Sequence, residues 1–120
     1  MGKQNEVIRD QLLMLLEQWQ TGAIDEREAH ERAEALLDQI GDQPDYPEDD
    51  PRAILMEVLV HLDALNHQLI TPDDIPAIRA FLQTRAGNES EGWTTWRMYW
   101  DNLDFDERRR KLKTNPYYST

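Results

Sequence analysis

The 120-residue sequence contains no cysteine, which excludes disulfide bonds, thiolate metal sites and a cysteine nucleophile. It also lacks a long hydrophobic run, because the first apolar stretch, residues 12–16, is too short for a signal-peptide core or a membrane span. A chain without disulfides suits a reducing compartment. We therefore expect a cytoplasmic protein that does not bind membranes.

Positive charge is scarce, and this limits the class of partner. The chain has 13 Lys and Arg against 24 Asp and Glu, a net charge of −11. Residues 1–92 hold 7 basic and 20 acidic side chains, a net −13, whereas residues 93–120 hold 6 and 4, a net +2. So acidic a body repels phosphate groups, and we expect no binding to nucleic acid. A macromolecular partner is expected to be a basic protein.

Alternation with period two, which is typical of β-strands, is also missing, and helical spacing dominates. The sequence therefore predicts an all-α fold, a single-domain bundle of five to six helices in which two similar helical hairpins are closed by an aromatic C-terminal helix. The predicted domain, residues 1–120, comprises a hairpin at 5–40, an acidic loop at 42–50, a hairpin at 51–86 and C-terminal helices at 89–114. Caps, glycines and prolines place the individual helices at about 5–21, 25–40, 51–68, 74–85, 89–102 and 107–113.

The two hairpins resemble each other when the chain is shifted by 46 residues. The shift aligns Leu12 with Val58 in the first helices and Asp25 with Thr71 at the second caps. A true internal repeat and two unrelated amphipathic hairpins both account for this match.

Three of the four tryptophans fall within "WTTWRMYW", residues 93–100. Trp93, Trp96 and Trp100 occupy positions i, i+3 and i+7, which lie on one face of a helix. A periodic aromatic stripe is typical of a core face, since aromatic side chains dominate core burial. A nucleic-acid stacking surface needs interleaved Lys and Arg, and Arg97 is the only base here. We expect Trp96 to be buried and one indole to be partly exposed.

Motifs for catalysis and cofactor binding are absent. The sequence has no Gly-rich phosphate loop, no G-x-S-x-G elbow, no calcium-loop spacing and no H-E-x-x-H or E-x-x-H motif. His61 follows Glu57 by one helical turn among apolar positions, which fits a core histidine better than a metal or acid–base site. The sequence predicts no metal site, no cofactor and no enzymatic activity.

The stretch "DQPDYPEDD", residues 42–50, combines two prolines with a block of acids and predicts an exposed loop. Asp45, Glu48 and Asp49 lie between proline-fixed bends, so their charges are displayed on a stiffened segment. Tyr46 supplies the apolar anchor that binding surfaces favour. We predict partner binding by Asp45, Tyr46, Glu48 and Asp49, and the competing interpretation is a solvated linker between the hairpins.

A basic cluster follows in "ERRRKLK", residues 107–113. Cations near a helix C-terminus interact favourably with the helix dipole, and these cations can pair with the acidic body. A phosphate-binding role is opposed by four nearby carboxylates in residues 101–107.

The stretch "EQWQTGAIDEREAHERAEALL", residues 17–37, precedes a Tyr/Pro/Asp loop and a leucine-rich helix. This layout resembles that of small acidic helical bacterial proteins, many of them uncharacterised and some of them immunity proteins that neutralise a toxin domain. The resemblance covers residues 5–84, and its signature is W-x-x-G-x-I followed by a capped helix. It implies a stoichiometric binder that uses acidic surface against a basic, often nuclease, partner, and it transfers no functional residue.

Together these features predict a non-enzymatic, acidic protein–protein interaction module of inhibitor or immunity type. The alternative is a helical assembly subunit or adaptor that forms a homodimer through its aromatic C-terminal region. A further alternative is an enzyme or metal-binding bundle centred on His61 and Glu57.

Overall fold

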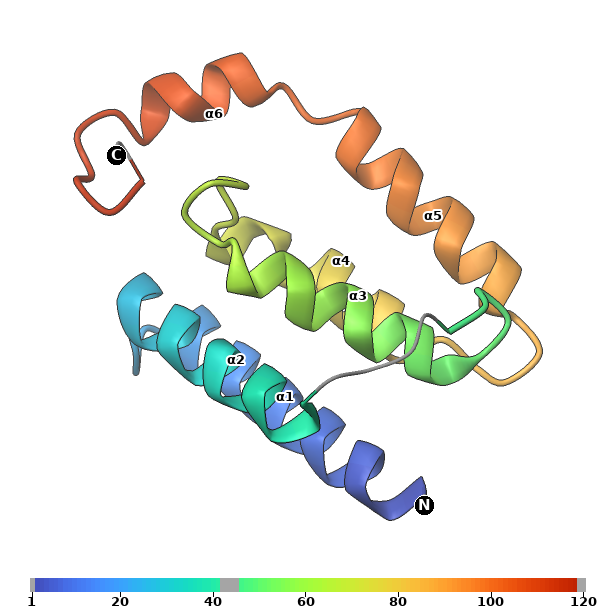
Figure 1. The fold of residues 1–120 in the computed structure, drawn as a ribbon. Helices are drawn as coiled ribbons and strands as arrows, with labels where there is room; N and C mark the ends of the chain where they lie inside the picture. The colour runs from blue at the N-terminus through green and yellow to red at the C-terminus, as the bar shows by residue number, and fades with distance from the viewer. Residues whose placement is uncertain (1, 42–45, 119–120) are drawn as a thin grey trace.

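Helices form about two thirds of the computed structural model, which describes residues 2–41 and 46–118 (Figure 1). The predicted all-α fold is confirmed, because the described residues contain no β-strand. The elements are α1 (Gly2–Gln20), α2 (Glu26–Ile40), α3 (Pro51–Asp63), the 3₁₀ turn η1 (Pro72–Asp74), α4 (Ile75–Leu82), α5 (Glu89–Asp101) and α6 (Phe105–Lys111).

The first hairpin pairs α1 with α2. Gly22 has a φ of +84°, the left-handed conformation that ends α1 at little steric cost. Asp25 then caps α2, because its carboxylate accepts a hydrogen bond of 2.9 Å from the Glu28 N–H. The buried Ile24 lies between these two signals and joins the turn to the core.

The second hairpin pairs α3 with η1 and α4, and its first helix is shorter than predicted. Asp50 caps α3 as expected, with Arg52 N–H donating to its Oδ1 over 2.9 Å. The helix ends at Asp63 rather than near residue 68, because the chain turns back through residues 64–69. Leu69 adopts a φ of +57° in this turn, a left-handed backbone conformation that is rare for residues with bulky side chains.

The start and end of α4 are each fixed by a side chain. Thr71 and Asp74 form a capping box, in which Asp73 N–H donates to Thr71 Oγ1 and Thr71 N–H donates to Asp74 Oδ2. The helix ends at Leu82, three residues before the predicted boundary. Thr84 accounts for this end, since both its N–H and its hydroxyl donate to the Phe81 carbonyl.

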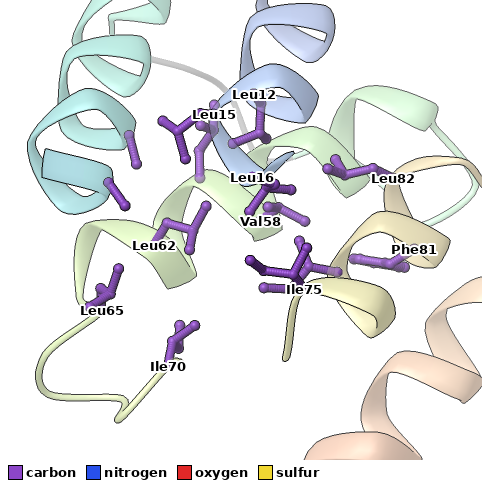
Figure 2. Packing of buried hydrophobic residues seen from close by; sticks show 14 of the residues in the cluster. Leu12, Leu15, Leu16, Val58, Leu62, Leu65, Ile70, Ile75, Phe81 and Leu82 are labelled. Carbon is purple, nitrogen blue, oxygen red and sulfur yellow. The ribbon is translucent and has the colours of Figure 1, made fainter. Parts of the chain in front are cut away.

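One hydrophobic core joins α1, α3 and α4 (Figure 2), and side chains from α2 and α5 complete it. Leucine and valine side chains from α1 and α3 point toward Ile75, Phe81 and Leu82 of α4, as Figure 2 shows. The largest fully buried apolar side chains are Ile8, Leu12, Leu16, Val58, Leu59, Leu62, Leu65, Ile70, Ile75 and Ile78, and the smaller Ala29 and Ala33 of α2 are equally buried. Both hairpins therefore bury the faces that helical spacing predicts.

Helices α5 and α6 form a bent arm on the side of α3 and α4 that faces away from α1 and α2 (Figure 1). Trp93 and Trp96 pack into the core, and Trp96 stacks on Phe81 of α4 with ring centroids 4.4 Å apart. Gly92 permits this close approach, because a Cβ atom there would lie 2.5 Å from Thr84 Oγ1 of the preceding turn. The predicted burial of Trp96 is confirmed, and Trp100 is the partly exposed indole.

No helix of the described residues is both long enough and apolar enough to span a lipid bilayer.

Candidate interaction surface

The acidic loop leads from α2 to α3, and the structure describes it from Tyr46 onward. Asp45, one of the four predicted binding residues, lies outside the described residues. Tyr46 is half-buried and packs against the core, while the Arg52 guanidinium lies over its ring at 4.4 Å from the centroid. Tyr46 therefore contributes to fixing the described part of the loop, and its role in partner binding stays a prediction.

Glu48 and Asp49 remain on the exposed side of the loop. The Glu48 carboxylate forms an ion pair with Arg97 of α5, with both side chains more than half exposed. Pairs of this kind contribute about 0–1 kcal/mol because water screens them. Asp49 is exposed and has no ion pair with a described residue. The two neighbouring carboxylates thus face solvent, as the sequence predicts for a displayed acidic segment.

The backbone beneath these carboxylates is held in place. Trp93 Nε1–H donates a hydrogen bond of 3.0 Å to the Glu48 carbonyl oxygen, which joins the loop to the buried part of α5. At the other end of the loop, Asp50 holds both the backbone and the guanidinium of Arg52. These hydrogen bonds lower the pKa of the Asp50 carboxyl, so its charge persists under mildly acidic conditions.

Unpaired carboxylates also line the exposed side of α2. Glu31, Glu34 and Asp38 have positions i, i+3 and i+7 and form one exposed stripe on this helix. None of them forms an ion pair with a described residue. The negative charge of the body is therefore presented to solvent rather than neutralised internally.

Glu57 and His61 come together beneath α5, as the sequence indicates. Their Oε2 and Nε2 atoms are 3.8 Å apart, and the imidazole lies between Trp96 and Trp100, with both ring centroids 5.2 Å away. Burial lowers the pKa of His61, and the nearby Glu57 carboxylate opposes that shift. Glu57 is itself engaged, because Trp96 Nε1–H donates to its Oε2 over 2.9 Å. The imidazole is therefore partly buried against the indoles, and neither ring nitrogen forms a hydrogen bond with a described residue.

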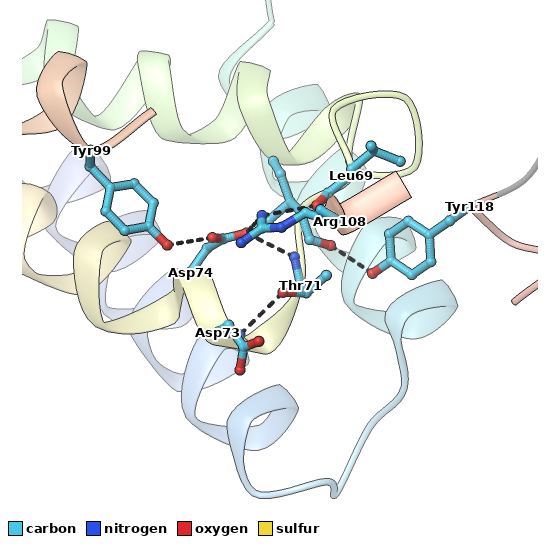
Figure 3. A network of polar contacts seen from close by, with 8 residues as sticks. Leu69, Thr71, Asp73, Asp74, Tyr99, Arg108 and Tyr118 are labelled. Atoms are coloured by element: carbon cyan, nitrogen blue, oxygen red, sulfur yellow. Dashed lines mark hydrogen bonds and ion pairs between the residues drawn. The ribbon is translucent and has the colours of Figure 1, made fainter. Parts of the chain in front are cut away.

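A buried polar network that sequence patterns did not predict is centred on Asp74 (Figure 3). Asp74 is completely buried; its Oδ1 accepts from the Tyr99 hydroxyl over 2.5 Å, and its Oδ2 accepts from Arg108 Nη1 over 2.7 Å. Arg108 also donates to the Leu69 carbonyl, and the Tyr118 hydroxyl donates to the Ile70 carbonyl. The capping pattern at residues 71–74 predicted a local role for Asp74 at the start of a helix. Its partners Tyr99 and Arg108 could not be predicted in this way, because they lie 25 and 34 residues further along the chain.

The rest of the basic cluster is paired only in part. Arg109 pairs with Asp106 and Lys111 pairs with Glu107, all on the exposed surface of α6. Arg110 and Lys113 form no ion pair with a described residue. The predicted pairing of this cluster with the acidic body is realised by Arg108 alone within the described residues.

Comparison of the chain with protein-family models, curated proteins and solved structures found no match. Its function must therefore be inferred from geometry and charge.

Proposed function

We propose that this protein is a non-enzymatic interaction module that binds a basic protein, in the manner of a toxin-neutralising or inhibitor protein. The observation that carries the proposal is that the described part of the acidic loop, residues 46–50, is tied to the core. The Trp93–Glu48 hydrogen bond holds Glu48 and Asp49 at the surface. A surface already ordered before binding loses less entropy when a partner docks.

The charge of the body supports the same conclusion. A net charge of −11 on 120 residues attracts a basic partner over long distances and raises the rate of association. The exposed stripe of Glu31, Glu34 and Asp38 adds to this field because no described cation neutralises it. The loop and the stripe both offer carboxylates to a partner.

The proposal includes no catalytic activity because of the contacts that Glu57 and His61 make, the acid–base pair that the sequence indicates. The carboxylate of Glu57 accepts the Trp96 indole N–H, and His61 is enclosed by two indole rings. A general acid or base must reach a substrate proton within hydrogen-bond distance. Glu57 is engaged with Trp96, and at 3.8 Å it does not hydrogen-bond His61 to orient it as a catalytic base.

The homodimer alternative receives less support from the aromatic helix. Trp93 and Trp96 are buried within the monomer, and the exposed large apolar side chain left on α5 is Met98, at 57% exposure. Stable interfaces bury about 1,000 Å² or more in total, which a single methionine does not supply.

The test uses affinity capture from the native host, followed by association rates for the captured partner. The variant neutralises the loop with Asp45→Asn, Glu48→Gln and Asp49→Asn; Asp50 is kept because it caps α3. The matched control removes the same charge from α1 with Glu6→Gln, Asp10→Asn and Glu17→Gln, three exposed acids. We expect the loop variant to associate on the order of tenfold more slowly at low salt, with a smaller difference at high salt.

Equal association rates for the loop variant and the α1 control would show that total charge, and not the loop, drives binding. Capture of partners that are all acidic, with no salt dependence, would contradict the proposal as a whole.

A further inference from the structure

His30, Glu34 and Asp63 converge beside the contact between α2 and α3. One possible ligand atom from each residue lies within 4.8 Å of the ligand atoms of the other two. His30 and Glu34 are one helical turn apart on α2, and Asp63 is the last residue of α3. The sequence predicts no metal site because this group matches no contiguous metal motif, and only the hairpin packing brings Asp63 to α2.

The imidazole of His30 is already oriented by two partners. Its Nε2 lies 2.6 Å from the Asp63 carbonyl oxygen, and its Nδ1 contacts the Tyr117 hydroxyl. Because a carbonyl oxygen only accepts, Nε2 donates to Asp63, and in the neutral ring Nδ1 accepts from Tyr117. Tyr117 is held in turn by Arg27, whose guanidinium lies 5.2 Å from the ring centroid.

The two carboxylates of the cluster are available. The side chains of Glu34 and Asp63 are exposed, and neither forms a hydrogen bond or ion pair with a described residue. Glu31 lies on the same side of α2 as Glu34 and adds to the negative potential there. A divalent cation would be balanced in charge by Glu34 and Asp63.

We infer that this cluster binds a divalent transition-metal cation of the Zn²⁺ type, with His30 Nε2 and the carboxylates of Glu34 and Asp63 as ligands. One imidazole nitrogen and two carboxylate oxygens are donors that Zn²⁺ uses in proteins, and three protein ligands leave one position for water. Binding of the cation breaks the Nε2 hydrogen bond and requires the imidazole to turn away from the Asp63 carbonyl, because that oxygen, 2.6 Å from Nε2, occupies the position the metal would take. The ring proton then resides on Nδ1 and is donated to Tyr117 Oη, an oxygen partner of the kind that orients metal-binding histidines.

The donor set also predicts selectivity. Ca²⁺ requires six to eight oxygen ligands, and Mg²⁺ keeps several waters and prefers oxygen. A site with one nitrogen and two carboxylates favours Zn²⁺ over both.

The experiment is calorimetric titration of the full chain, first stripped with a chelator, with ZnCl₂, MgCl₂ and CaCl₂ as probes. We expect one Zn²⁺ per chain and no comparable heat from Mg²⁺ or Ca²⁺. His30→Gln, Glu34→Gln and Asp63→Asn should each raise the Zn²⁺ dissociation constant about tenfold or more. Glu31→Gln is the matched control, since it removes the same charge from the same helix, and His67→Ala removes an exposed histidine outside the cluster.

Co²⁺ provides a spectroscopic readout, because visible absorption from Co²⁺ bound to wild type should disappear in Glu34→Gln. If His30→Gln fails to fold, the exposed Glu34→Gln carries the test. Equal Zn²⁺ affinity in all variants overturns the assignment. So does an effect of Glu31→Gln as large as that of Glu34→Gln, or binding of Mg²⁺ as tight as that of Zn²⁺.

Discussion

Arg108 of α6 and Asp74 of η1 form an ion pair of 2.7 Å, with side chains that are 13% and 0% exposed. This pair connects the C-terminal arm to the turn between α3 and α4 (Figure 3). The Tyr99 hydroxyl completes the hydrogen bonding of the same carboxylate from α5. A single buried acid therefore positions both helices of the arm.

Asp74→Asn should destabilise the protein by about 3–5 kcal/mol, because it leaves the Arg108 charge buried without its partner. Urea unfolding monitored by tryptophan fluorescence measures the change. Asp73→Asn is the matched control, since this neighbouring carboxylate is exposed and forms no ion pair with a described residue. Similar losses for the two variants would mean that the network contributes little to stability.

The decrease in the free energy of unfolding at alkaline pH should depend on Tyr99. Burial and the hydrogen bond to Asp74 raise the pKa of Tyr99 to about 12, above the ordinary value of 10.0. The folded state keeps the phenol proton that the unfolded state releases, so this contribution is complete below pH 10 and is lost as the pH rises toward 12. The free energy of unfolding of Tyr99→Phe should therefore fall less steeply than that of wild type between pH 10 and about 12, the interval between the unfolded and folded pKa values. Identical slopes in wild type and variant would contradict this.

Acidification should act through His61. Burial lowers its pKa below the ordinary 6.5, so near that pH the unfolded state binds a proton that the folded state does not. Stability therefore falls as the pH drops through 6.5 toward the lower folded-state value. Proton NMR of the imidazole should show a titration midpoint for His61 below that in the urea-unfolded chain. A midpoint equal to or above the unfolded one would contradict the burial argument.

Trp96→Ala should destabilise by about 3–5 kcal/mol, because it opens a large cavity beside Phe81 and removes the hydrogen bond to Glu57. Chemical denaturation compared with Thr95→Ala measures the effect, since Thr95 is exposed on the same helix. A loss below about 1 kcal/mol for Trp96→Ala would indicate that α5 packs weakly and would revive a docking role for its aromatic face.

Local features of the sequence determined the helices and most of their caps. Asp25, Asp50 and Thr71 act as N-caps, and each does so through hydrogen bonds to residues two or three positions away. Such contacts depend only on neighbouring residues, so pattern alone predicts them. The burial of Trp96 followed from its spacing with Trp93, which the same helix determines.

Tertiary structure decided which distant side chains meet. The pairing of Asp74 with Arg108, the approach of Asp63 to His30 and the contact of Trp93 with the loop span 34, 33 and 45 residues. Tertiary structure also ends α3 earlier than the sequence predicts. The turn from residue 64 to Leu69 brings η1 and α4 back against α3, and this packing outweighs the helix propensity of residues 64–68. Helical periodicity states which face of a helix is buried, but the crossing of two helices decides which residues on those faces touch. For that physical reason the core and the Glu57–His61 pair within one helix were predictable from the sequence, whereas the clusters around Asp74 and His30, which join distant helices, were not.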